Sequence, residues 1–140
     1  SNGSDTSLVL QWSGGAWSVA SSPTTGDTNR LASVSCPTNT SCTAVGDYES
    51  GSRYETLIMN WDGASWSIVT SPNDGDGANN LESVTCLDPS SCIAVGGYYD
   101  VSRKLTLALR SVDPNPPGPP TTTTTTTTDP SAPVIPAFTG

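Results

Sequence analysis

The four cysteines are the residues best suited to chemistry, and they form two pairs with identical spacing, Cys36 with Cys42 and Cys86 with Cys92. Zinc binding is not favoured, because the sequence contains no histidine and no C-x-x-C spacing. A nucleophilic thiol is not favoured either, since no histidine is present to activate it. Of the three possible disulfide connectivities, only Cys36–Cys42 with Cys86–Cys92 treats the two pairs alike. These disulfides indicate an oxidising compartment and hence an extracellular protein.

Acidic residues suggest a second chemistry, the binding of calcium. Asp74 and Asp76 alternate in NDGDGANN (73–80), as the first ligands of a calcium loop do. The later ligand positions do not fit, because they hold Ala78 and Thr85. We therefore expect no metal and no cofactor, with calcium at Asp74 and Asp76 as the weaker alternative.

The cysteine pairs belong to a longer repeat. Leu8, Trp12, Trp17 and Pro23 recur 49 residues later, and Leu31, Val34, Cys36, Cys42, Ala44, Val45, Gly46, Tyr48 and Arg53 recur 50 residues later. The change of offset places a one-residue insertion between Pro72 and Leu81. A third copy begins at TLALR (106–110), which matches TLIMN (56–60). A period near 50 residues that contains only strands is typical of propeller blades.

One period predicts four strands, at LASVSC (31–36), CTAVGDY (42–48), ETLIMNW (55–61) and WSIVT (66–70). The first two flank a five-residue loop, PTNTS, and the last two flank DGAS, whose Asp-Gly step favours a tight hairpin turn. The heptapeptides WSGGAWS (12–18) and WDGASWS (61–67) are then hairpin tips with one Trp on each strand. We expect these tryptophans to pack across the strands rather than to bind a ligand.

The motif L-x-x-V-[ST]-C-x5-C-x-A-V-G, followed by T-L-x-x-x-W-x-G-x-x-W-S, resembles the repeats of secreted bacterial β-propeller proteins and, more distantly, Asp-box propellers. The resemblance covers about residues 7–111 and implies an all-β fold of about two four-stranded antiparallel blades, an incomplete ring within residues 1–112. The outer strands of one blade would occupy 7–20, a full blade 31–70, and the inner three strands of the last blade 81–111. Exposed blade faces would then pack on remaining blades in cis or drive self-association in trans.

The same resemblance implies that four connecting segments share one face of the propeller, together with all four tyrosines. Tyrosine with arginine and acids suits sugars or peptides, although polar loops with aromatic strand ends would look the same. The expected ligand-binding residues are Tyr48, Arg53, Tyr54, Tyr98, Tyr99 and Arg103. We expect a non-catalytic module that binds carbohydrate or protein. A glycosidase or sialidase-like enzyme and a structural spacer are the alternatives, but no carboxylate pair stands out from its repeat context.

The last segment, residues 113–140, changes composition abruptly. It is rich in Pro and contains eight consecutive threonines, which predicts a disordered, extended stalk. Its end, PAFTG (136–140), is similar to the sorting pentapeptides of Gram-positive surface proteins, with Pro136 in place of the usual Leu. That similarity implies attachment to the cell surface or cell wall.

Charge and hydropathy exclude two kinds of partner. Five Lys and Arg stand against thirteen Asp and Glu, a net charge of −8. Nucleic acids and anionic membrane surfaces both require a basic face, so neither is an expected partner. No apolar stretch is long enough to cross a membrane.

Overall fold

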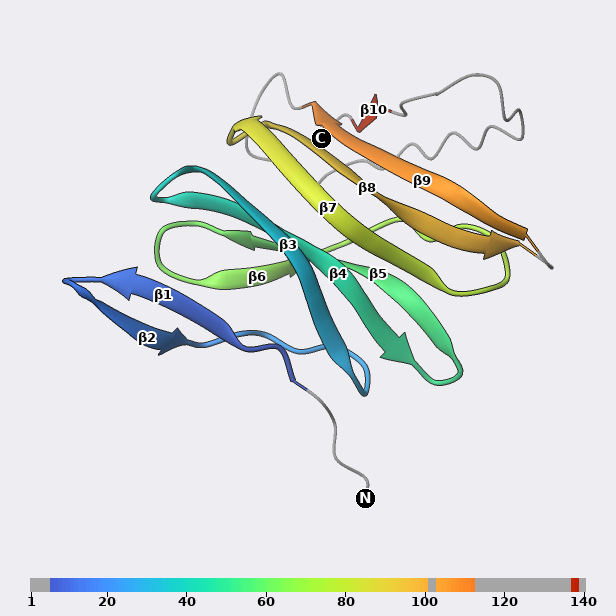
Figure 1. The fold of residues 1–140 in the computed structure, drawn as a ribbon, viewed down its shortest axis with the longest axis horizontal. Coiled ribbons are helices and arrows are strands. Elements are labelled where there is room, and N and C mark those ends of the chain that lie inside the picture. Colours follow the sequence, from blue (N-terminus) through green and yellow to red (C-terminus); the bar gives the residue numbers. More distant parts are fainter. Residues whose placement is uncertain (1–5, 101–102, 113–136, 139–140) are drawn as a thin grey trace.

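The structure, a computed structural model, describes residues 6–100, 103–112 and 137–138, and the regular elements of this part are all strands (Figure 1). The predicted all-β fold is therefore confirmed. The strands are β1 (Val9–Ser13), β2 (Ala16–Ala20), β3 (Asn29–Thr38), β4 (Ser41–Ser50), β5 (Arg53–Trp61), β6 (Trp66–Val69), β7 (Asn79–Asp88), β8 (Ser91–Asp100), β9 (Arg103–Val112) and β10 (Ala137–Phe138). Within the described ranges, no helix has the length and apolar character that crossing a membrane requires.

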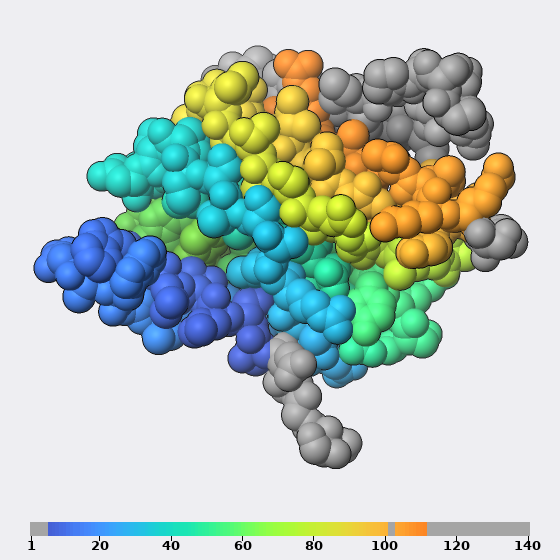
Figure 2. Space-filling view, in the orientation of Figure 1, coloured from blue at the N-terminus to red at the C-terminus, as the bar shows by residue number. Residues whose placement is uncertain are grey.

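The strands form three sheets. β1 and β2 make an antiparallel N-terminal hairpin, β3-β4-β5-β6 make an antiparallel central sheet, and β7-β8-β9 make an antiparallel C-terminal sheet whose outer edge is extended by β10. Each strand of the central sheet pairs with the next in sequence, because every connection within it is a short turn. The space-filling view shows the N-terminal hairpin as a separate lobe beside β3 (Figure 2).

The strand β10 lies within the segment expected to be a disordered stalk. Ala137 pairs with Arg110 and Phe138 with Ser111, in parallel with β9. β10 thus occupies the edge of β9 that corresponds to the edge of β5 paired with β6 in the central sheet. The remainder of that stalk, 113–136 and 139–140, lies outside the described residues, so its disorder stays a prediction.

Both predicted disulfides are present, Cys36–Cys42 and Cys86–Cys92, each with a Cα–Cα distance of 4.0 Å. The five-residue loop expected between their strands is wrong, because strand pairing continues past the cysteines. Thr38 pairs with Ser41, which leaves a two-residue turn, and Cys86 lies directly opposite Cys92. The disulfides therefore link facing strands rather than the two ends of a loop, and a bulge in each ladder accommodates the extra residue.

The tryptophans pack across the hairpins as expected. Trp12 faces Trp17 with ring centroids 5.4 Å apart, and Trp61 faces Trp66 at 5.7 Å. In the second hairpin, the Asp62 carboxylate accepts hydrogen bonds from the amides of Ala64 (2.9 Å) and Ser65 (2.8 Å). Gly63 has a φ of 97°, which residues with a side chain rarely adopt, so the Asp-Gly step fixes this turn.

The main core lies between the central sheet and the C-terminal sheet. Its buried residues are Val45 from the central sheet and Leu81, Val84, Cys92, Ala94, Tyr98, Leu107 and Leu109 from the C-terminal sheet. A second cluster of Ala44, Leu57 and Met59 is buried on the other face of the central sheet. The central sheet is therefore apolar on both faces, as is expected of a layer between two others.

Candidate ligand-binding site

Two linkers, residues 21–28 and 70–78, join the three sheets, and each is shaped by a buried asparagine. Asn29, 4% exposed, accepts a hydrogen bond from the Thr25 amide (3.0 Å), and Asn79, 3% exposed, accepts one from the Asp74 amide (2.9 Å). Neither asparagine is among the residues that the sequence predicts for the site. The sequence does hold a signal for them, because an asparagine recurs at the same position of both copies. An asparagine side chain can hydrogen-bond to the backbone of a turn and so hold the turn in one conformation.

Each linker also pairs with the end of a strand in the following hairpin. Asp27 and Thr28 exchange backbone hydrogen bonds with Glu49 at 2.9 and 2.8 Å. Gly77 and Ala78 exchange the equivalent bonds with Tyr99 at 3.1 and 3.0 Å. Because Gly26 and Gly75 share a positive φ and precede these pairs, the inserted residue of the second linker is Asp76.

The linker 70–78 is fastened to the central sheet by Thr56, which is 2% exposed. The Thr56 hydroxyl donates to the carbonyl oxygen of Pro72 (2.8 Å) and accepts from the Ser71 hydroxyl (2.6 Å). Its amide donates to the side-chain oxygen of Asn73 (2.7 Å). These contacts hold the linker at the end of the central sheet where β4 turns into β5.

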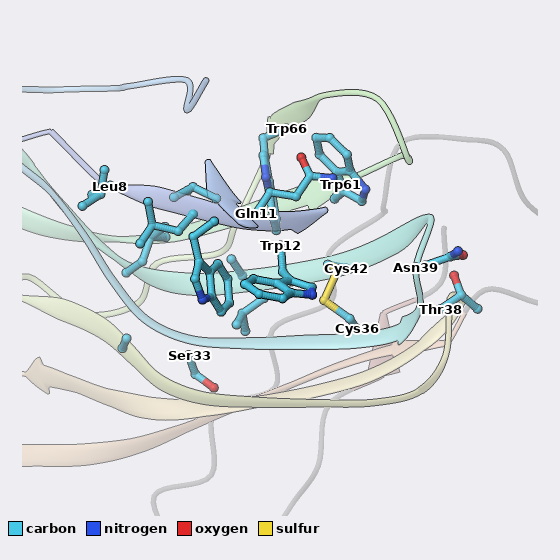
Figure 3. A pocket seen from close by; sticks show the side chains of 17 residues that line it. Leu8, Gln11, Trp12, Ser33, Cys36, Thr38, Asn39, Cys42, Trp61 and Trp66 are labelled. Atoms are coloured by element: carbon cyan, nitrogen blue, oxygen red, sulfur yellow. A yellow bond between two sulfur atoms is a disulfide. The ribbon is translucent and has the colours of Figure 1, made fainter. Parts of the chain in front are cut away.

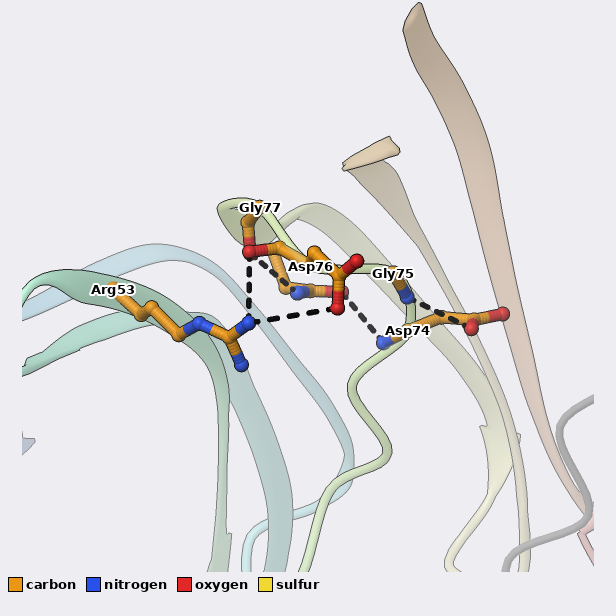
Figure 4. A network of polar contacts seen from close by, with 6 residues as sticks. Arg53, Asp74, Gly75, Asp76 and Gly77 are labelled. Atoms are coloured by element: carbon orange, nitrogen blue, oxygen red, sulfur yellow. Dashed lines mark hydrogen bonds and ion pairs between the residues drawn. The ribbon is translucent and has the colours of Figure 1, made fainter. Parts of the chain in front are cut away.

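Arg53, at the start of β5, meets the inserted residue of that linker (Figure 4). Its guanidinium donates to the carbonyl oxygen of Asp76 at 2.9 Å and lies 3.7 Å from the Asp76 carboxylate. Both side chains face solvent, with 52% of Arg53 and 89% of Asp76 exposed. An ion pair this exposed contributes about 0–1 kcal/mol, so either partner can exchange it for another ligand at little cost.

A second arginine, Arg30 on β3, belongs to the same sheet. Arg30 is 3.5 Å from the Asp47 carboxylate, and its guanidinium sits over the Tyr54 ring at 5.1 Å from the centroid. Burial raises the pKa of the Asp47 carboxyl, and the Arg30 charge opposes that rise. We call the contact between Arg53 and Asp76 the polar cluster. Arg30, Asp47 and Tyr54 form a separate group on the opposite face of the sheet, because Arg53 and Tyr54 are neighbours on β5 and neighbouring side chains of a strand point to opposite faces.

Two expected ligand-binding tyrosines point inward instead. Tyr98 is 3% exposed and belongs to the main core, and burial raises the pKa of its hydroxyl. Tyr48 packs against the second apolar cluster, and its hydroxyl donates to the Glu55 carboxylate. This hydrogen bond is the main reason why the pKa of Tyr48 rises to about 12.

The remaining expected residues lie on the C-terminal sheet. Tyr99 is 46% exposed, and Arg103 is an exposed residue in register with Asp100. The calcium candidates are engaged within the protein: Asp76 pairs with Arg53, and one oxygen of Asp74 accepts from the Gly75 amide at 2.8 Å. The described residues contain no group of three or more His, Cys, Asp or Glu placed to hold a metal ion.

Comparisons of the chain with protein-family models, with curated proteins and with solved structures found no match.

Proposed function

We propose that the chain is a non-catalytic, extracellular binding module built from β-propeller repeats, and that it takes a carbohydrate ligand at the polar cluster. Three observations support the repeat architecture: the consecutive order of β3 to β6, the equivalent disulfides, and the stacking of the central sheet on the C-terminal sheet. The disulfides are compatible with an extracellular location. Attachment to the cell surface remains part of the proposal and rests on the PAFTG sequence.

The exposed pairing of Arg53 with Asp76 carries the ligand assignment. Sugar hydroxyls both donate and accept hydrogen bonds, so a guanidinium beside a carboxylate offers both kinds of partner. On the other face of the sheet, Arg30 and Asp47 form the same combination beside the Tyr54 ring, which makes that group a second candidate. The cluster is preorganised by the linker contacts of Thr56 and yet stays open to solvent.

A glycan array probed with the full chain tests this assignment. We expect at least one glycan to bind, and Arg53→Ala to weaken that binding by about tenfold or more, the loss expected for one charge-assisted hydrogen bond. Arg103→Ala is the matched control, because Arg103 is the repeat equivalent of Arg53 on β9.

Two results would contradict the assignment. If Arg103→Ala weakened binding as much as Arg53→Ala, the ligand would not depend on the polar cluster. If no glycan bound, carbohydrate would be the wrong ligand class, and immobilised extracellular proteins would be the next probes.

A further inference from the structure

Val34 and Val84 are equivalent residues of the repeat, yet Val34 is 58% exposed and Val84 only 7%. Val84 packs against the central sheet, whereas Val34 lines an apolar cavity of about 530 Å³ between the N-terminal hairpin and β3 (Figure 3). Leu10 and Trp12, 49% and 57% exposed, line the same cavity together with the Cys36–Cys42 disulfide. Exposed apolar surface of this kind is typical of a site where another protein segment packs.

The strand beside the cavity also has a free edge. β1 is the repeat equivalent of β5, since Leu8 and Trp12 correspond to Leu57 and Trp61. β5 is paired on both sides, by β4 and β6. Among the described residues β1 pairs with β2 alone, so the edge that corresponds to the one held by β4 offers its amide and carbonyl groups.

The contact between the central and C-terminal sheets shows what such a partner looks like. β3 stacks on β7 through two hydroxyl groups: Ser33 accepts a hydrogen bond from the Val84 amide (3.2 Å) and Ser35 one from the Cys86 amide (2.9 Å). Next to them, Val45 of β4 inserts into the core and is fully buried. One hairpin of the repeat therefore contributes two hydroxyl residues, in the pattern Ser-x-[Ser/Thr], and a valine. The next hairpin contributes the backbone amides of its Val and Cys positions, which donate to those hydroxyl groups.

We propose that the cavity and the free edge of β1 accept a two-stranded β-hairpin with the repeat's own pattern, L-x-x-V-[ST]-C-x5-C-x-A-V-G. The second strand of this hairpin pairs with β1, and its first strand stacks on β3. Its two hydroxyl residues accept hydrogen bonds from the amides of Val34 and Cys36, and its valine fills the cavity. This hairpin site depends on the sheet contacts and is independent of the carbohydrate assignment.

A hairpin of an adjoining repeat fits this place better than a second copy of the chain does. The outward face of the C-terminal sheet carries the matching residues, with Ser83, Thr85 and Val95 all exposed. However, β7 and β8 are joined there by a third strand, β9, which is equivalent to β1. If the C-terminal sheet of a second copy docked in the same way, its β9 would occupy the space of β1.

A fusion protein tests the proposal. A copy of residues 29–49 is placed ahead of Ser1, so that Ser1 takes the place of Ser50 and residues 2–3 take the place of the β4–β5 turn at residues 51–52. Amide hydrogen exchange, followed by NMR, is compared in the fusion and in the unfused chain. We expect the amides of Val34 and Cys36 to exchange about tenfold more slowly or better in the fusion, because hydrogen bonding protects them.

Two variants of the added hairpin separate the polar contacts from the packing. Ser33→Ala with Ser35→Ala in the added copy should remove the protection of the two amides and leave the hairpin docked. Val45→Asp in the added copy should abolish docking altogether, since it buries an unpaired charge. Unchanged exchange at Val34 and Cys36 in the unaltered fusion would overturn the proposal.

Light scattering of the unfused chain decides between the two partners. A monomer supports an adjoining hairpin as the natural occupant. Val34→Glu and Val95→Glu change exposed residues on the two surfaces that a second copy would bring together, so neither is expected to unfold the chain. An oligomer that both substitutions dissociate would overturn the proposal in favour of a second copy.

Discussion

Replacing Val84 with alanine is expected to destabilise the protein far more than the same change at Val34, the equivalent residue of the preceding copy. Val84 is 7% exposed in the main core and Val34 is 58% exposed. The substitution removes two methyl-sized groups, each of which contributes about 0.8 kcal/mol when buried, or about 1.6 kcal/mol in all. The cavity left behind adds to this, so Val84→Ala should cost about 2–3 kcal/mol. Val34→Ala should cost less than about 1 kcal/mol.

Urea unfolding of the two variants and of the parent chain, followed by tryptophan fluorescence, measures both costs. In thermal unfolding, Val84→Ala should lower the melting temperature by about 8 °C or more, at roughly 4–8 °C per kcal/mol for a domain of this size. The pair is internally controlled, because the residue type, the strand position and the neighbouring disulfide are the same. Equal losses at the two positions would refute the reasoning, since they would mean that this face of the repeat is packed alike in both copies.

Two further predictions concern the linker end of the central sheet. Thr56→Val should lower the free energy of unfolding by about 1–3 kcal/mol, because it leaves linker groups without their partner, whereas Thr106→Val, at the exposed equivalent, should change it by no more than about 0.5 kcal/mol. Denaturant unfolding measures both, and similar values would contradict the anchoring role. The hydrogen bond to Glu55 raises the pKa of Tyr48 from 10.0 to about 12 in the folded protein. The hydrogen bond therefore stabilises the fold fully at pH values below 10.0, the pKa of tyrosine in the unfolded chain, and this stabilisation is lost as the pH rises through about 12. The stability difference between the parent and Tyr48→Phe should therefore be constant below about pH 10 and shrink between about pH 10 and pH 12; a difference that persists at high pH would contradict this.

The local signals of the sequence are sufficient to predict β1 to β9 and the disulfides, but not β10, which lies in a segment whose composition predicts disorder. Alternation of apolar residues, the Asp62-Gly63 turn and the spacing of the cysteines all act over a few residues, and the structure follows them. The loop at Cys36–Cys42 was predicted too long, because polar residues such as Thr38 and Ser41 carry no apolar alternation although their backbones still pair. Pairing of this kind depends on backbone hydrogen bonds, and the hydropathy of the side chains does not report on them.

The candidate site was harder to predict, because side-chain direction depends on tertiary packing. Tyr48 and Tyr98 stand beside loops in the sequence, yet one step of the strand alternation turns both rings inward. The contact between Arg53 and Asp76 joins residues 23 positions apart and depends on the path of a linker. Asn29 and Asn79 could have been found from their repetition, whereas the role of Thr56 could not, because threonines at strand positions are common and most face solvent.

The single inserted residue, Asp76, bears on the number of ligands that one chain can hold. A strictly repeated protein presents each surface as many times as it has copies, and ligands with several epitopes then bind such a protein with avidity. The polar cluster combines Arg53 of one copy with Asp76, an inserted residue that has no equivalent in the linker 21–28. On the proposed function, each chain is therefore monovalent within these repeats. Strong attachment to a multivalent glycan surface would then depend on how densely the chains are displayed and not on how many copies each contains.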